Sequence, residues 1–109
     1  MRMKVQGDLY CVREKNIPER AHPVRPEGNR FILRRGEATG HAHAVAAEEG
    51  VEVYEKDGCL YVATARFAAV THEEHKPLTL EPGLWRIGIQ REYDPFEEEE
   101  QRRLRQIGD

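Results

Sequence analysis

The sequence predicts an all-β fold, a small sandwich or barrel of short antiparallel strands with one α-helix at its C-terminal end. Short runs rich in β-branched and aromatic residues recur with turn residues between them. Asp57-Gly58 stands between two of these runs, which is a strong signal for a β-hairpin. With 109 residues the chain has the length of one domain, which we expect over 1–109 with a β core at about 5–93.

The expected strands follow one another along the chain. They lie at 9–13, 30–35, 41–47, 51–56, 59–65, 67–71 and 84–90. Between the first two, Pro18, Pro23 and Pro26 exclude a helix or a central strand, so we expect an ordered loop at 16–29. The apolar run at 78–80 precedes a turn at Pro82-Gly83.

The one expected helix lies at about 95–107. Asp94 is a favourable N-cap, Pro95 suits the first helical position, and Glu97 completes a capping-box pattern. The apolar side chains of this segment form only a thin stripe, so we expect the helix to dock weakly. They are Phe96, Leu104 and Ile107.

Composition and charge limit the classes of function. The net charge is −3, and no apolar run approaches the ~18–20 residues that cross a bilayer. No apolar stretch follows the basic start, so we expect no signal peptide and no membrane partner. Cys11 and Cys59 lie far apart without a CxxC motif and are expected to be free thiols. These features predict a cytoplasmic protein.

Four of the five histidines fall in two close pairs. His41 and His43 are two apart in an expected strand and therefore share a face, whereas the spacing of His72 and His75 suits a turn. Imidazole is a common ligand of zinc and other transition metals, and carboxylates can complete the shell. We expect the four histidines to converge on one site that holds zinc or a similar divalent ion. The nearby carboxylates are Glu37, Glu73 and Glu74.

Three functions fit such a site. With one coordination position open, metal-activated water would hydrolyse a phosphoester, either in RNA or in a small phosphorylated ligand. Without a metal, one protonated and one neutral imidazole would cleave RNA as acid and base, with a cation such as Arg34, Arg35 or Arg86 on the phosphate. In a non-catalytic assembly module, the histidines would instead lie at the subunit contacts of a homo-oligomer.

Two motifs carry a resemblance. The segments 36–45 (GEATGHAHAV) and 71–78 (THEEHKPL), followed by Pro82-Gly83 and 90–95 (QREYDP), resemble a family of small uncharacterised bacterial and phage proteins. This resemblance covers nearly the whole chain and implies no activity.

The first of these motifs is also similar to a motif of the cupins. The order Gly36, His41, His43 and Glu48 is similar to the first cupin motif, in which a Gly, an HxH and a Glu lie on β-strands around a metal. The second cupin motif, a single late His before an Asn, is not reproduced at 71–75. The likeness to the first motif implies a metal held between strands.

Overall fold

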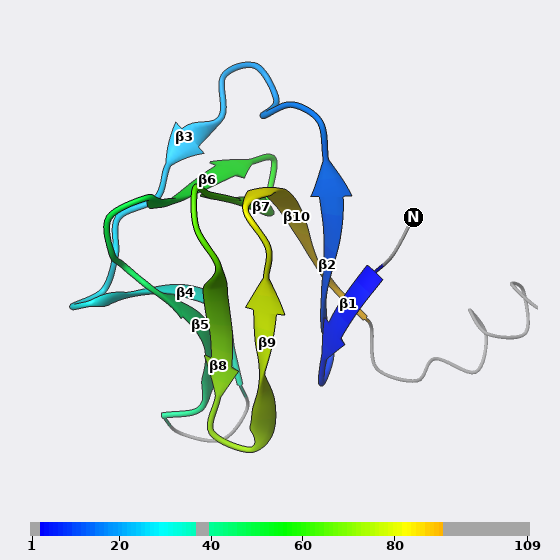
Figure 1. Ribbon diagram of the computed structural model, residues 1–109, viewed down its shortest axis with the longest axis vertical. Helices are drawn as coiled ribbons and strands as arrows, with labels where there is room; N and C mark the ends of the chain where they lie inside the picture. The colour runs from blue at the N-terminus through cyan, green and yellow to red at the C-terminus, as the bar shows by residue number, and fades with distance from the viewer. Residues whose placement is uncertain (1–2, 37–39, 91–109) are drawn as a thin grey trace, which may run out of the picture.

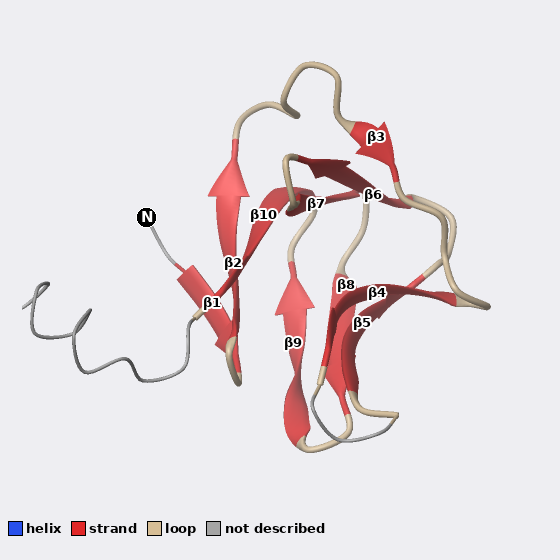
Figure 2. Cartoon of the chain, turned by 180° about the vertical axis from the view of Figure 1, so that it is seen from behind, coloured by secondary structure: helices blue, strands red, loops and turns tan. Residues whose placement is uncertain are grey.

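The computed structural model describes residues 3–36 and 40–90, and every regular element within them is a strand (Figures 1 and 2). The strands are β1 (Met3–Gln6), β2 (Leu9–Glu14), β3 (His22–Pro23), β4 (Arg30–Arg35), β5 (Ala42–Ala46), β6 (Val51–Lys56), β7 (Cys59–Thr64), β8 (Ala68–His72), β9 (His75–Leu80) and β10 (Gly83–Ile89). The prediction of an all-β fold is confirmed. The helix expected at 95–107 lies outside the described residues, among which no helix has the length and hydropathy of a membrane span.

The strands form two antiparallel sheets. One sheet has the order β1-β2-β10-β7-β6-β3, and the other has the order β4-β5-β8-β9. The predicted hairpin is present, since β6 and β7 pair from Val51↔Thr64 to Lys56↔Cys59. Asp57 and Gly58 both have positive φ, 51° and 79°, as the tight turn of a two-residue hairpin requires.

The core lies between the two sheets. Successive side chains of a strand point to opposite faces, and buried residues alternate with more exposed ones along β2, β4, β8 and β10. Each large apolar side chain that is fully buried contributes roughly 1.5–3 kcal/mol. The six-stranded sheet contributes Leu9, Cys11, Val51, Val53, Val62, Trp85 and Ile87, and the four-stranded sheet contributes Phe31, Leu33, Val45, Ala68, Val70 and Leu80.

Three segments differ from the expected strands. β1 was not expected, and β9 begins at His75 although only the run at 78–80 was recognised. The expected loop at 16–29 contains β3, which has two residues and lies at the edge of its sheet, where proline is tolerated. The strand expected at 41–47 begins at Ala42, so that His41 directly precedes it.

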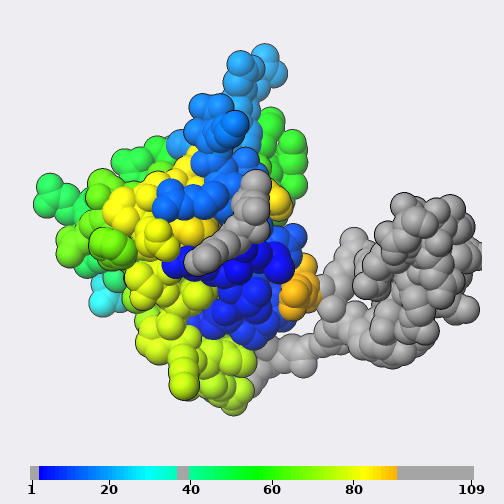
Figure 3. Space-filling model, turned by 45° about the vertical axis from the view of Figure 1, so that its right-hand side comes forward, coloured from blue at the N-terminus to red at the C-terminus, as the bar shows by residue number. Residues whose placement is uncertain are grey.

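β1 joins the two sheets, since it pairs with β2 and also lies against β9 (Figure 3). The Lys4 amine donates a hydrogen bond to the carbonyl of Thr79 at 2.6 Å. The Gln6 amide nitrogen donates to the carbonyls of Val70 and Lys76, at 2.9 and 2.8 Å. These bonds hold the turn between β1 and β2 against the hairpin of β8 and β9.

Candidate functional site

The four paired histidines meet at one end of the four-stranded sheet. His41 directly precedes β5 and His43 is the second residue of this strand, while His72 ends β8 and His75 begins β9. The ring centroid of His72 is 4.4 Å from that of His43, 4.7 Å from that of His75 and 5.8 Å from that of His41. Two pairs that are distant in sequence therefore form one histidine cluster, consisting of His41, His43, His72 and His75.

The hairpin of β8 and β9 sets the second pair. His72 and His75 are the last partners of this ladder, and Glu73 and Glu74 form the turn between them, as the spacing of three predicted. The backbone N–H of Glu74 donates a hydrogen bond to His72 Nδ1 at 3.0 Å. A neutral His72 in this arrangement therefore carries its proton on Nε2.

His43 is the buried member of the cluster, with 1% of its surface exposed. Its Nδ1 lies 2.8 Å from Gln6 Oε1, and its Nε2 lies 3.0 Å from Asp8 Oδ1. The Gln6 amide nitrogen donates to two carbonyls, so Oε1 faces His43 as an acceptor and Nδ1 donates to it. Burial lowers the pKa of His43, and the neighbouring His72 and His75 add to this effect, whereas the hydrogen bond with Asp8 opposes it. Both ring nitrogens of His43 are engaged.

Charged side chains surround the cluster. Arg34 Nε lies 3.5 Å from Asp8 Oδ2, so this expected cation is connected to His43 through the Asp8 carboxylate. Glu74 Oε1 lies 3.6 Å from His41 Nδ1. The third expected carboxylate, Glu37, lies outside the described residues. Anions from two different turns therefore flank the imidazoles.

Glu73 belongs to the exposed side of the cluster. Its Oε1 accepts a hydrogen bond from the backbone N–H of Ala42 at 2.8 Å, and this bond and one from its own amide lower the pKa of the Glu73 carboxyl. His41 and His72 lower this pKa further. One donor atom each from His41, His72 and Glu73 lie within 4.8 Å of one another. These three residues have the donor types that a transition-metal ion requires.

Gln6 and Asp8 were not recognised from the sequence. Asp8 follows Gly7 in a turn, and Gln6 is one polar residue in a short strand. Neither position carries a local sign of contact with His43. The two other arginines expected near the phosphate lie elsewhere: Arg35 pairs with Glu27, and Arg86 Nε donates to Glu14 Oε1 at 2.9 Å.

Comparison with known proteins identifies the family. A family model described as a domain of unknown function, DUF8820, matches residues 5–90, and the chain belongs to this family. The matched segment contains the whole histidine cluster together with Gln6 and Asp8, and a family of unknown function is consistent with the expected membership of an uncharacterised family. No curated protein and no solved structure matches the chain.

Proposed function

We propose that this member of the DUF8820 family binds a divalent transition-metal ion, zinc or a similar one, through His41, His72 and Glu73. The observation that supports the proposal is the convergence of three donor atoms within 4.8 Å at the exposed side of the cluster. Imidazole nitrogen and carboxylate oxygen both ligate zinc, at about 2.0–2.2 Å, so small side-chain movements complete the site. The order of Gly36, His41 and His43, which is similar to the first cupin motif, agrees with this role.

The surroundings of His41 suit a metal ligand. A ligating histidine usually directs its second ring nitrogen at a carboxylate, which fixes the ring and raises its basicity. Glu74 Oε1, 3.6 Å from His41 Nδ1, is placed for this role and leaves Nε2 for the ion. His43 would not ligate the ion, because both of its ring nitrogens contact Gln6 and Asp8. Its ring would instead pack against the ring of the ligand His72.

Metal binding at His72 has a structural consequence. A neutral imidazole that ligates through Nε2 carries its proton on Nδ1. In the present arrangement His72 Nδ1 accepts the N–H of Glu74. We therefore expect metal binding to break this bond and to shift the turn between β8 and β9, which makes the Glu74 amide a reporter of occupancy.

Three protein ligands leave a coordination position open, as in catalytic zinc sites. An ion held by these residues would lower the pKa of its water toward neutrality and would so supply a nucleophile for phosphoester hydrolysis. Arg34, 3.5 Å from Asp8, and Arg30, whose Nη1 is 3.9 Å from Glu73 Oε2, add positive charge beside the site. We therefore propose a metal-dependent phosphodiesterase, acting on RNA or on a small phosphorylated ligand.

Calorimetric titration of the untagged, metal-stripped chain with zinc chloride tests the metal site. The wild type should bind about one ion, and His72→Ala should weaken binding at least about tenfold. His22→Ala is the matched control, because His22 is an exposed histidine in β3, outside the cluster, and its loss should change nothing. A wild type that binds no zinc, or a His72→Ala variant that binds it as well as the wild type, would refute the site.

Hydrolysis of bis(p-nitrophenyl) phosphate and of a short RNA, each with and without EDTA, tests the reaction. We expect activity that EDTA abolishes, that zinc restores and that His72→Ala lacks. RNA cleavage that survives EDTA and leaves 2′,3′-cyclic phosphate ends would favour metal-free acid and base catalysis by the same histidines instead. Zinc binding without hydrolysis would support the proposed metal site and would refute the proposed phosphodiesterase reaction.

A further inference from the structure

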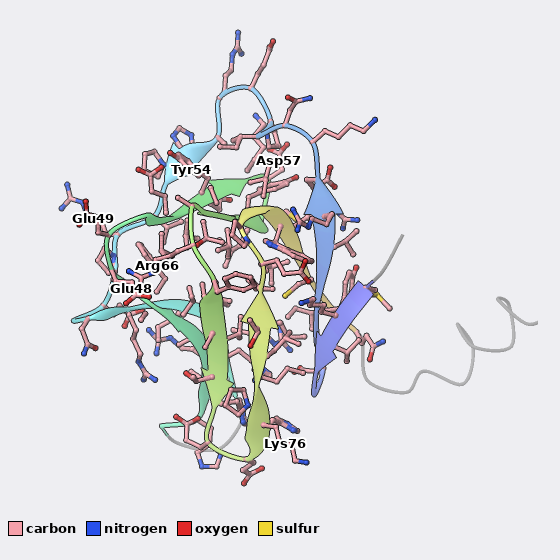
Figure 4. All side chains as sticks on the ribbon, in the orientation of Figure 1. Glu48, Glu49, Tyr54, Asp57, Arg66 and Lys76 are labelled. Atoms are coloured by element: carbon pink, nitrogen blue, oxygen red, sulfur yellow. The ribbon has the colours of Figure 1, made fainter. Side chains whose placement is uncertain are left out.

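The outer face of the six-stranded sheet carries the three tyrosines of the described residues, Tyr10, Tyr54 and Tyr61. Each of them is half-buried and is next to a core residue of its own strand, so its side chain points away from the core. Tyr54 of β6, shown in Figure 4 near β3, is the direct partner of Tyr61 in β7. Direct partners have Cβ atoms about 4.5–5.5 Å apart, so these two aromatic side chains are neighbours on this face.

Tyr10 lies across the neighbouring strand β10. Its partner there is Gly88, and a Cβ atom at Gly88 would collide with Cζ and the hydroxyl oxygen of the Tyr10 side chain. The ring therefore occupies the space above Gly88 in which any other residue would have its own side chain. A ring that lies along the sheet in this way has one face against the backbone and the other face directed outward.

A groove of about 680 Å³ continues this outer face beyond the tyrosine pair. Its lining includes Ala63 and Leu84, which are partners across β7 and β10. They lie two residues along their strands from Tyr61 and Arg86 and therefore point to the same face. Ile17, 39% exposed in the loop after β2, forms a further apolar wall. Small-ligand sites have volumes of about 300–1,000 Å³, so the groove has the size of such a site.

Polar side chains along the groove can donate and accept hydrogen bonds. Glu52 lines the groove, and its Oε2 accepts a hydrogen bond from the Tyr54 hydroxyl at 2.6 Å. Lys15 and Asn16 also line it, and their side chains have no hydrogen-bond or ion-pair partner within residues 3–36 and 40–90. The groove thus offers a carboxylate acceptor, an ammonium donor and an amide that can do both.

The charges of this face balance one another. Arg86 Nε donates to Glu14 Oε1 at 2.9 Å, and Lys56 Nζ lies 4.0 Å from Asp57 Oδ2. The groove itself has one charge of each sign among its lining residues. A nucleic acid would require a predominantly basic surface, so this face favours a ligand without net charge.

We propose that the outer face of the six-stranded sheet binds a neutral oligosaccharide, whose sugar rings stack on the tyrosines and whose hydroxyl groups bond to the polar side chains of the groove. A pyranose ring has a face of C–H groups that packs on an aromatic ring, and a rim of hydroxyls that donate and accept hydrogen bonds. Such a ligand matches the aromatic surface, the mixed donors and acceptors and the balanced charge. None of these residues belongs to the histidine cluster, so this inference is independent of the proposed metal site.

Binding of the full chain to an array of immobilised neutral oligosaccharides tests the class of ligand, with poly(U) and poly(A) RNA as the comparison. The wild type should bind at least one neutral oligosaccharide and should bind it more tightly than either RNA. A wild type that binds no neutral oligosaccharide would overturn the proposal. Tighter binding of RNA than of every sugar would also overturn it, and would identify this surface as one for nucleic acid.

Variants and NMR test the place of binding. Tyr61→Ala should weaken binding of the best oligosaccharide at least about tenfold, whereas Tyr61→Phe, which retains the ring, should keep most of the affinity. Phe67→Ala is the matched control, because Phe67 is 65% exposed and directly precedes β8 of the other sheet. In the wild type, the sugar should shift the ring-proton signals of Tyr54 and Tyr61. A sugar that shifts neither signal, or a folded Tyr61→Ala variant that binds as well as the wild type, would exclude this face.

Discussion

Cys11 shows what burial does to a single side chain in this sandwich. Its surface is 0% exposed, and burial raises the pKa of the thiol to about 12, with Lys4 acting weakly in the opposite direction. A thiol that stays protonated is a poor nucleophile and a poor metal ligand. Cys11 therefore acts as a small apolar residue of the core, as its position in alternating β2 indicates.

The raised pKa of Cys11 predicts a pH dependence of stability. The thiol ionises near 9.0 when unfolded and near 12 when folded, so the native state retains a proton that the unfolded state loses. The free energy of unfolding should therefore fall as pH rises from 9 toward 12, by up to ~1.4 kcal/mol per pH unit from this residue. Urea denaturation of wild type and Cys11→Ala between pH 7 and about 10 measures it. Equal slopes for the two proteins would contradict the prediction.

Among the elements, those with local signals were predictable and those held by distant contacts were not. The hairpin of β6 and β7 was predicted because Asp57-Gly58 determines its turn. β1 was missed, and only the end of β9 was recognised, because the sequences of both strands carry weak strand signals. The two strands are held together by hydrogen bonds from the Lys4 and Gln6 side chains of β1 to carbonyls of β9. The two histidine pairs were visible as motifs. Their meeting depends on the pairing of β5 with β8, which no local signal in the sequence specifies.

The turn between β1 and β2 shows how an element positions the cluster. Gly7 has φ of 60°, and a Cβ atom there would lie 2.6 Å from His75 Nε2. The turn therefore approaches the cluster as closely as a residue without a side chain allows. A change at Gly7 should affect the histidines, and not only the turn.

Gly7→Ala and Gly28→Ala test this effect as a matched pair. Both glycines have positive φ, 60° and 66°, so each substitution should lower the free energy of unfolding by about 1 kcal/mol. Only Gly7→Ala should move His75, since a Cβ at Gly28 meets nothing within 4 Å. NMR spectra of the histidine ring protons would report the movement. Unchanged histidine signals in Gly7→Ala would refute this role of the turn.

At the scale of the whole molecule, one amide connects both sheets and the candidate site. Gln6 extends from the six-stranded sheet to the carbonyls of Val70 and Lys76 in the four-stranded sheet, and it also accepts from His43. Gln6 is 4% exposed, so its own amide depends on these protein groups and not on water for its hydrogen bonds. The site and the packing of the two sheets therefore share a residue.

Gln6→Leu should destabilise the whole molecule. The substitution keeps the size of the side chain and removes three hydrogen bonds, which we expect to lower the free energy of unfolding by roughly 2–4 kcal/mol. Lys4→Met is the control from the same strand; its bond to Thr79 is exposed, and its loss should cost less than about 1 kcal/mol. Chemical denaturation measures both changes. Equal effects of the two substitutions would show that the buried amide contributes no more than the surface contact.

The capping of β9 by side chains of β1 also bears on aggregation. β9 ends the four-stranded sheet, and an uncovered outer strand offers carbonyl and amide groups to any foreign peptide in extended form. Here the Lys76 and Thr79 carbonyls are already taken by Gln6 and Lys4, and Pro77 between them has no amide hydrogen to offer. The hydrogen bonds that hold β1 against β9 therefore also protect this edge strand from the addition of further strands, which is how fibrils grow.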